Sequence, residues 1–134
     1  MAAIIGDQDA LYESLREILR KHANQLTIGR DTASEYCLNA SVGAATLAAW
    51  GGKLRQPTIP VAWLRRGTSN VSYHLIGLAG NEALVAGLSR ELRARLSGKT
   101  CFTFPSINSH LLEELDGVTA NAIAGMRRAG FIEV

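Results

Sequence analysis

The sequence predicts a small α+β domain in which helices cover an antiparallel or mixed sheet. Three observations predict this class: an amphipathic helical pattern opens the chain, alternating stretches with turn residues fill its middle, and a second helical pattern closes it. The order of these elements lacks the regular strand–helix alternation of a doubly wound fold. At 134 residues, we expect one domain over residues 1–134, because domains typically run to about 100–200 residues.

The first helix is predicted by apolar residues that recur at helical spacing. Its stripe consists of Leu11, Leu15, Ile18, Leu19 and His22. Residues at these intervals lie on one side of a helix, which is the pattern of a buried face. Either Asp7 or Asp9 could cap the N-terminus, since a short carboxylate accepts hydrogen bonds from free backbone amides.

Extended structure is predicted for the stretch that follows. Residues 34–38 form a plausible strand, with Tyr36 and Leu38 on one face and Cys37 on the other. The polar sequence Gly29-Arg30-Asp31 is expected to interrupt the extended pattern before it. Residues 43–52 are rich in small side chains, and their pattern fits a short helix and a hairpin arm equally well.

A hairpin is predicted next. Thr58 to Arg66 and Val71 to Gly77 alternate as strands, and residues 67–70 supply the turn between them. Pro60 has no N–H to donate to a ladder, which favours an edge position or the beginning of the strand.

The second half of the chain returns to helices. Residues 81–96 predict one or two short helices, with Ser89 as the cap of the second. Cys101 to Phe104 predicts a short strand. A helical region then runs over residues 109–129, which Gly117 could divide and Gly130 is expected to end.

Composition limits the classes of function. Hydrophobic residues make up 47% of the chain and charged residues 19%, enough for a packed core. The net charge of +2 is too small to predict a nucleic-acid partner. The longest weakly polar run, residues 42–50, is shorter than the roughly 20 residues that span a bilayer, so we expect no membrane association. The N-terminus does not resemble a signal peptide and the two cysteines match no metal spacing, so a cytoplasmic protein with reduced thiols is expected.

Two short motifs suggest chemistry. Gly98-Lys99-Thr100 resembles part of a phosphate-binding loop, but Arg93 stands at the position of the earlier glycine and a predicted strand follows instead of a helix, so this interpretation is rejected. His74 and Cys101 would form a thiol–imidazole pair if their strands were neighbours. The alternative is that both residues only stabilise the sheet.

The first helix carries a row of carboxylates. Asp9, Glu13 and Glu17 share one face, because they are four residues apart. Carboxylate oxygens are ligands for hard cations, so this face could hold a metal ion. A solvated helix surface, with an ordinary Glu17–Lys21 pair, is the alternative.

The chain resembles the YdhG-like family of small bacterial domains of unknown function. The resemblance rests on the leading amphipathic helix and on the segments Glu35–Leu38, Arg65–Gly67, Val71–Leu75, Leu88–Leu92, Gly98–Phe104 and Ala129–Ile132. It implies a YdhG-like α+β fold. One branch of this family resembles frataxin and is described as an iron chaperone, which implies iron handling through an exposed acidic patch.

The sequence therefore predicts a non-catalytic cytoplasmic module that binds a small molecule or a protein, with homodimer formation left open. The cofactor, if there is one, is unknown from the sequence. The predicted ligand-binding residues are Arg66, Tyr73, His74, Lys99 and Cys101. Two alternatives stay open: iron handling through Asp9, Glu13 and Glu17, and a thiol-dependent enzyme in which His74 activates Cys101.

Overall fold

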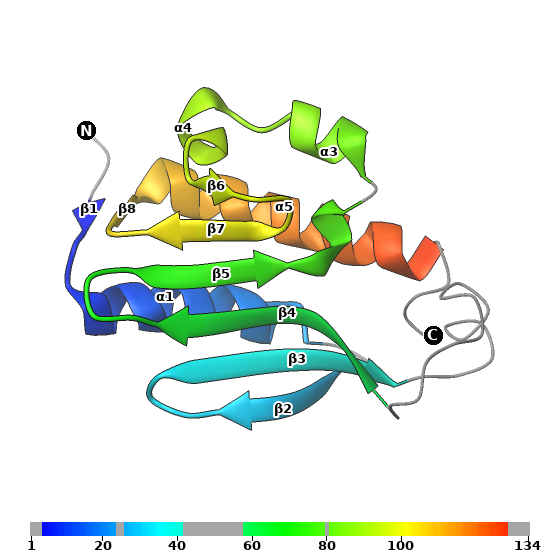
Figure 1. Cartoon of the computed structure of the whole chain (residues 1–134), viewed down its shortest axis with the longest axis horizontal. Helices are drawn as coiled ribbons and strands as arrows, with labels where there is room; N and C mark the ends of the chain where they lie inside the picture. The colour runs from blue at the N-terminus through cyan, green and yellow to red at the C-terminus, as the bar shows by residue number, and fades with distance from the viewer. Residues whose placement is uncertain (1–3, 24–25, 42–57, 80, 129–134) are drawn as a thin grey trace.

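A computed structural model describes residues 4–23, 26–41, 58–79 and 81–128, and it confirms the α+β class (Figure 1). A six-stranded antiparallel sheet has the strand order β2-β3-β4-β5-β7-β6, and β1 pairs with β8 in a separate small sheet. The strands are β1 (Ile4–Ile5), β2 (Thr27–Asp31), β3 (Glu35–Ser41), β4 (Thr58–Arg66), β5 (Val71–Leu75), β6 (Leu96–Ser97), β7 (Cys101–Phe104) and β8 (Ile107–Asn108). The helices are α1 (Gln8–Lys21), the 3-10 helix η1 (Ile76–Leu78), α3 (Glu82–Ala86), α4 (Arg90–Arg93) and α5 (Ser109–Arg128).

The two long helices, α1 and α5, lie side by side on one face of the sheet (Figure 1). The main core fills the layer between them and the sheet. Its largest fully buried side chains are Tyr12, Tyr36, Tyr73, Phe102, Phe104, Leu11, Leu15, Leu19, Leu38, Leu64, Leu75 and Leu92. Helix α1 follows the predicted stripe, and Asp7 caps it by accepting a hydrogen bond from the Asp9 amide at 2.9 Å. The stripe ends at His22, which is the C-cap and is half-buried.

The edge strand β2 corrects one sequence prediction. Gly29-Arg30-Asp31 does not interrupt the extended structure but lies within β2, where a register shift between Ile28 and Arg30 accommodates the glycine. A bulge lets a strand absorb an unpaired residue without ending. As predicted, Tyr36 and Leu38 of β3 are buried while Cys37 is half-buried on the other face.

The predicted hairpin is confirmed as β4 and β5, but β5 ends at Leu75, and Ile76 and Gly77, predicted in the strand, lie in η1. Strand β4 lies inside the sheet, but its pairing with β5 begins only at Ala62, so at Pro60 it has a neighbour on one side alone. The missing N–H of Pro60 falls beside a second register shift, between Leu38 and Asn39 of β3. The proline thus lies near the beginning of an internal strand, where β4 is paired with β3 alone.

Helix α5 is continuous, so the expected division at Gly117 is wrong. Apolar side chains on both sides of Gly117 face the core, and their burial outweighs the weak helix propensity of one glycine. The stretch 81–96 contains two short helices, α3 and α4, and the Ser89 side chain caps α4 as predicted. Its end is not helical, because Leu96 begins β6 and pairs with Phe102 of β7. The predictions for residues 43–52 and for Gly130 lie outside the described residues.

Within the described part of the chain, no helix combines the length and the apolar character that crossing a bilayer requires.

Candidate functional site

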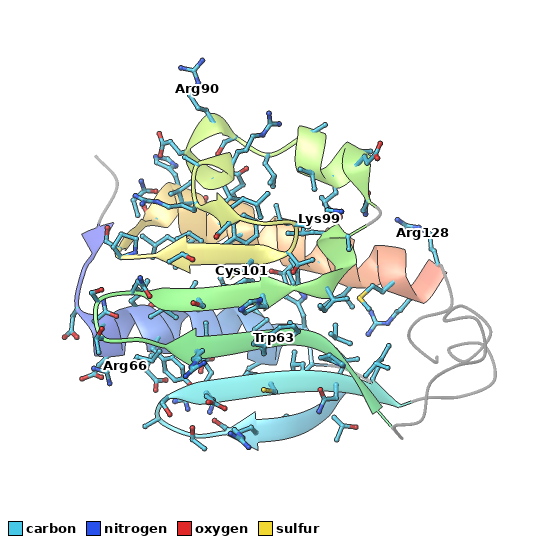
Figure 2. All side chains as sticks on the ribbon, viewed as in Figure 1. Trp63, Arg66, Arg90, Lys99, Cys101 and Arg128 are labelled. Atoms are coloured by element: carbon cyan, nitrogen blue, oxygen red, sulfur yellow. The ribbon has the colours of Figure 1, made fainter. Side chains whose placement is uncertain are left out.

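One face of the six-stranded sheet carries a row of chemically distinctive side chains. Cys37, Trp63, His74 and Cys101 are successive cross-strand partners on β3, β4, β5 and β7. We call these four residues the open-face row. They point away from α1 and α5, and none of the described helices covers this face in the view of Figure 1 (Trp63 and Cys101 are labelled in Figure 2). All four are half-buried.

The strand period explains why these residues share a face. Successive side chains of a strand point to opposite sides, so residues next to core positions point outward. Tyr73 and Leu75 of β5 are buried against the helices, and His74 between them points the other way. The same rule places Cys101 opposite to Phe102 on β7.

Trp63 and His74 form a stacked pair at the centre of the open-face row. Their ring centroids are 4.4 Å apart and their planes differ by 16°. This separation is close to the roughly 4.8 Å between neighbouring strands, so the stack runs across the strands. The two rings therefore stand out from the sheet with their edges toward solvent, and each covers one face of the other.

His74 and Cys101 contact each other on the other side of this stack. The distance from His74 Nε2 to Cys101 Sγ is 3.4 Å. Burial lowers the pKa of His74. Burial also raises the pKa of the Cys101 thiol, although hydrogen bonds with Thr103 and the Tyr73 backbone act in the opposite direction. Both pKa shifts favour a neutral imidazole beside a neutral thiol, whereas a cysteine nucleophile needs a thiol with a lowered pKa.

A second, polar row lies beside the open-face row. Glu35, Arg65, Ser72 and Thr103 are in register on the same four strands. Glu35 forms an ion pair with Arg30, with 2.7 Å between a guanidinium nitrogen and a carboxylate oxygen. Arg65 is exposed. An open depression follows this row at the β4–β5 turn, lined by Arg65, Arg66, Gly67, Thr68 and Ser72. The face thus combines an aromatic centre with charged groups of both signs.

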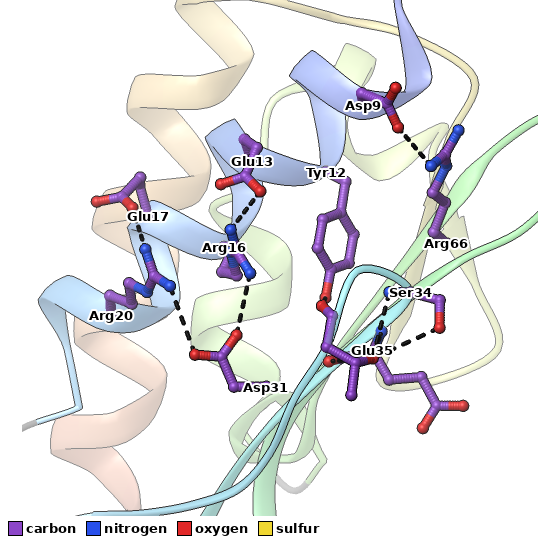
Figure 3. Close-up of polar contacts among 11 residues, drawn as sticks. Asp9, Tyr12, Glu13, Arg16, Glu17, Arg20, Asp31, Ser34, Glu35 and Arg66 are labelled. Atoms are coloured by element: carbon purple, nitrogen blue, oxygen red, sulfur yellow. Dashed lines mark hydrogen bonds and ion pairs between the residues drawn. The ribbon is translucent and has the colours of Figure 1, made fainter.

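Of the five predicted ligand residues, His74 and Cys101 are brought together, while Tyr73 and Arg66 lie apart from them. Tyr73 lies on the helix side with no exposed surface, and its hydroxyl is 2.6 Å from Thr119 Oγ1. Arg66 also belongs to the helix side, where it forms an ion pair with Asp9 of α1 (Figure 3). The burial of Tyr73 leaves it no surface for a ligand, whereas Arg66 lines the depression at the β4–β5 turn while pairing with Asp9.

Lys99 is exposed in the turn between β6 and β7, two residues before Cys101 (Figure 2). Gly98, before it, has a φ of 73°, a left-handed conformation that glycine adopts without strain. Strand β7 follows the turn directly, which agrees with the rejection of a phosphate-binding loop. The lysine lines a depression with Leu78, Val85 and Leu96, beside α3.

The carboxylates on the predicted acidic face of α1 are paired with arginines. Glu13 pairs with Arg16 and Glu17 with Arg20, and both arginines also contact Asp31 of β2 (Figure 3). The expected Glu17–Lys21 pair is wrong: the amine of Lys21 instead contacts Asp116 of α5. Because each carboxylate is already neutralised by a cation, the ion-pair role accounts for this face.

Among the residues that the structure describes, no group of three or more His, Cys, Asp or Glu side chains is arranged to hold a metal ion. Sequence reasoning found His74 and Cys101 but missed Trp63, Cys37 and Arg65 as their neighbours. The hairpin turn at residues 67–70 contained the necessary signal, because it pairs Trp63 with His74 once the register is fixed.

Comparison with known proteins gave no match: no family model fits the chain, and no curated protein and no solved structure matches it.

Proposed function

We propose that this protein is a non-catalytic protein-binding module whose binding surface is the open face of the sheet. The observation that carries the proposal is the open-face row, with Trp63 at its centre and charged Arg65 beside it. Tryptophan and arginine are enriched among the residues that dominate binding energy at protein interfaces. Small-molecule sites are usually concave, whereas the face of a sheet is broad.

The other predictions from the sequence keep the status of predictions. They are the YdhG-like resemblance, the cytoplasmic location, a small molecule as the ligand, iron handling by the acidic face of α1, and catalysis by Cys101. The arginine partners of Glu13 and Glu17 weaken the case for iron handling. The raised pKa of the Cys101 thiol weakens the case for catalysis.

Site-specific photo-crosslinking in living cells tests the proposal. A photoreactive phenylalanine analogue replaces Ser72, which lies on the open face beside His74. The matched control places the same group at Glu113, which is exposed on α5 and lies on the helix side. We expect a discrete protein adduct from position 72 and none from position 113.

Two variants show whether the adduct depends on the face itself. Trp63→Ser removes the aromatic centre, and Arg65→Glu reverses an exposed charge without disturbing the core. Both should abolish the adduct at position 72 while the far-UV circular dichroism stays that of the wild type. Equal adducts from positions 72 and 113, or no adduct from position 72, would contradict the proposed function.

A further inference from the structure

The open-face row contains a pair of metal-binding atoms. His74 Nε2 and Cys101 Sγ lie 3.4 Å apart on adjacent strands β5 and β7. Imidazole nitrogen and thiolate sulfur are the two donors that zinc takes most often in structural sites. Both side chains are half-buried on a face that the described helices leave uncovered.

The distance between the two atoms fits a particular coordination geometry. Zinc binds thiolate at about 2.3 Å and imidazole at about 2.0–2.1 Å. At a tetrahedral angle these bonds place sulfur and nitrogen about 3.5 Å apart, and in a linear arrangement about 4.4 Å apart. The observed 3.4 Å matches one edge of a tetrahedron. The distance is thus compatible with both atoms binding one zinc ion, with two coordination positions left open.

We infer that His74 and Cys101 are half of a Zn²⁺ site, and that the same two residues of a second copy of this chain complete it. The inference rests on the proposed function, because it makes a second copy the partner of the open face. A two-fold axis through the metal would turn two half-sites into a Cys₂His₂ tetrahedron, the composition of a closed structural zinc site.

The symmetry is compatible with the dimensions of packed sheets. Two sheets pack face to face about 10 Å apart, so a metal on the axis lies about 5 Å above each sheet. A cysteine side chain extended by one zinc–sulfur bond reaches this height, as does the imidazole of a histidine on the neighbouring strand. The described residues offer no third donor of their own beside the pair, so the second copy supplies what one copy lacks.

The proton balance of binding is simple. Each Cys101 thiol loses its proton to solvent and binds as a thiolate, and each His74 binds as a neutral imidazole through Nε2 with its proton on Nδ1. One Zn²⁺ therefore joins two chains and releases two protons. No atom changes its oxidation state.

Cys37 provides a control within the same row. It is half-buried on the open face like Cys101, and burial raises the pKa of both thiols. Its cross-strand partners, however, are Arg30 and Trp63, neither of which is a zinc ligand. Replacement of Cys37 removes an equivalent thiol without removing a donor of the proposed site.

Sedimentation velocity with added zinc tests the inference. Metal-free protein should double its sedimenting mass when one Zn²⁺ is added for every two chains. Cys101→Ser and His74→Gln should each abolish the doubling, whereas Cys37→Ser should retain it. Replacement of zinc by Co²⁺ should give the visible absorption of a tetrahedral site and a thiolate charge-transfer band in the wild type and in Cys37→Ser alone. Circular dichroism confirms that each variant is folded.

The possible results separate this inference from the proposed function. Zinc binding at one ion per chain without a change of mass would overturn the inference, as would no zinc binding, or equal losses in Cys37→Ser and Cys101→Ser. A crosslink from position 72 to a different protein, formed equally in the Cys101→Ser variant, would support the open face as a binding surface and overturn the second copy as its partner.

Discussion

The buried hydroxyl pair of Tyr73 and Thr119 gives a test of which side chains on β5 serve the core. Thr119 Oγ1 donates to the carbonyl oxygen of Leu115 at 2.7 Å, and it lies 2.6 Å from the Tyr73 hydroxyl. Because the threonine proton is used within α5, the tyrosine must donate to Thr119 Oγ1. Both residues have no exposed surface, so water cannot replace either partner.

The direction of this hydrogen bond determines how much stability each variant should lose. Tyr73→Phe removes the donor and leaves Thr119 bonded to Leu115, so we expect a loss of about 1 kcal/mol in the free energy of unfolding. Thr119→Val keeps the shape of the side chain but leaves a buried phenol O–H without an acceptor, which costs about 2 kcal/mol. The double variant removes both polar groups, and it should be no less stable than Thr119→Val alone.

Urea unfolding followed by far-UV circular dichroism measures all four proteins, with similar m-values as the check that the unfolded states are comparable. The expected non-additivity is about 1 kcal/mol, which exceeds the roughly 0.3–0.5 kcal/mol within which independent sites add. If the double variant loses the sum of the two single losses, the two hydroxyls do not interact and the reasoning is refuted.

Two further perturbations test other contacts of the helices. Burial raises the pKa of Asp116, but hydrogen bonds and charge from Lys21 and His22 outweigh it and hold this pKa below its ordinary value. A lowered pKa stabilises the folded state above the unfolded pKa of about 3.9, and the gain is lost as the pH falls through the folded value. Asp116→Asn should therefore cost about 1 kcal/mol at pH 7, and this cost should shrink as the pH is lowered into the acid range, measured by urea unfolding over a series of pH values. A loss that stays the same at every pH would contradict the assignment. A Cβ added at Gly77 would lie 2.6 Å from a backbone oxygen of α5, so Gly77→Ala should destabilise by about 1–3 kcal/mol, whereas Gly117→Ala, with nothing within 4 Å, should stabilise α5 by about 0.5–1 kcal/mol. Thermal melts that rank these two variants in the opposite order would overturn the packing argument.

Local patterns predicted most of the fold because they act over a few residues. The stripe of α1 and the alternation of β3 correspond directly to the side chains that are buried. The errors arose where contacts between residues far apart in the sequence determine the local structure. Gly29-Arg30-Asp31 belongs to β2 because it pairs with β3 through a register shift, and Asp31 also contacts Arg16 of α1, which no local pattern indicates.

The candidate site was predicted in part for the same reason. His74 and Cys101 were recognised as residue types, and their contact depended on β5 and β7 being neighbours, which the structure provides. Trp63 was missed because the face on which it lies depends on the register of the hairpin. Arg66 was included among the ligand residues, but its ion pair with Asp9 becomes visible only when α1 is placed against β4.

The two faces of β5 have different roles in this protein. Tyr73 and His74 are adjacent in sequence, and the strand period sends one side chain into the core and the other to the open face. Tyr73→Phe should therefore lower stability and leave zinc-dependent mass doubling unchanged, while His74→Gln should abolish the doubling with little loss of stability. Loss of both properties in either variant would mean that the two faces are coupled through β5, and the open face could not then be treated as a surface independent of the core.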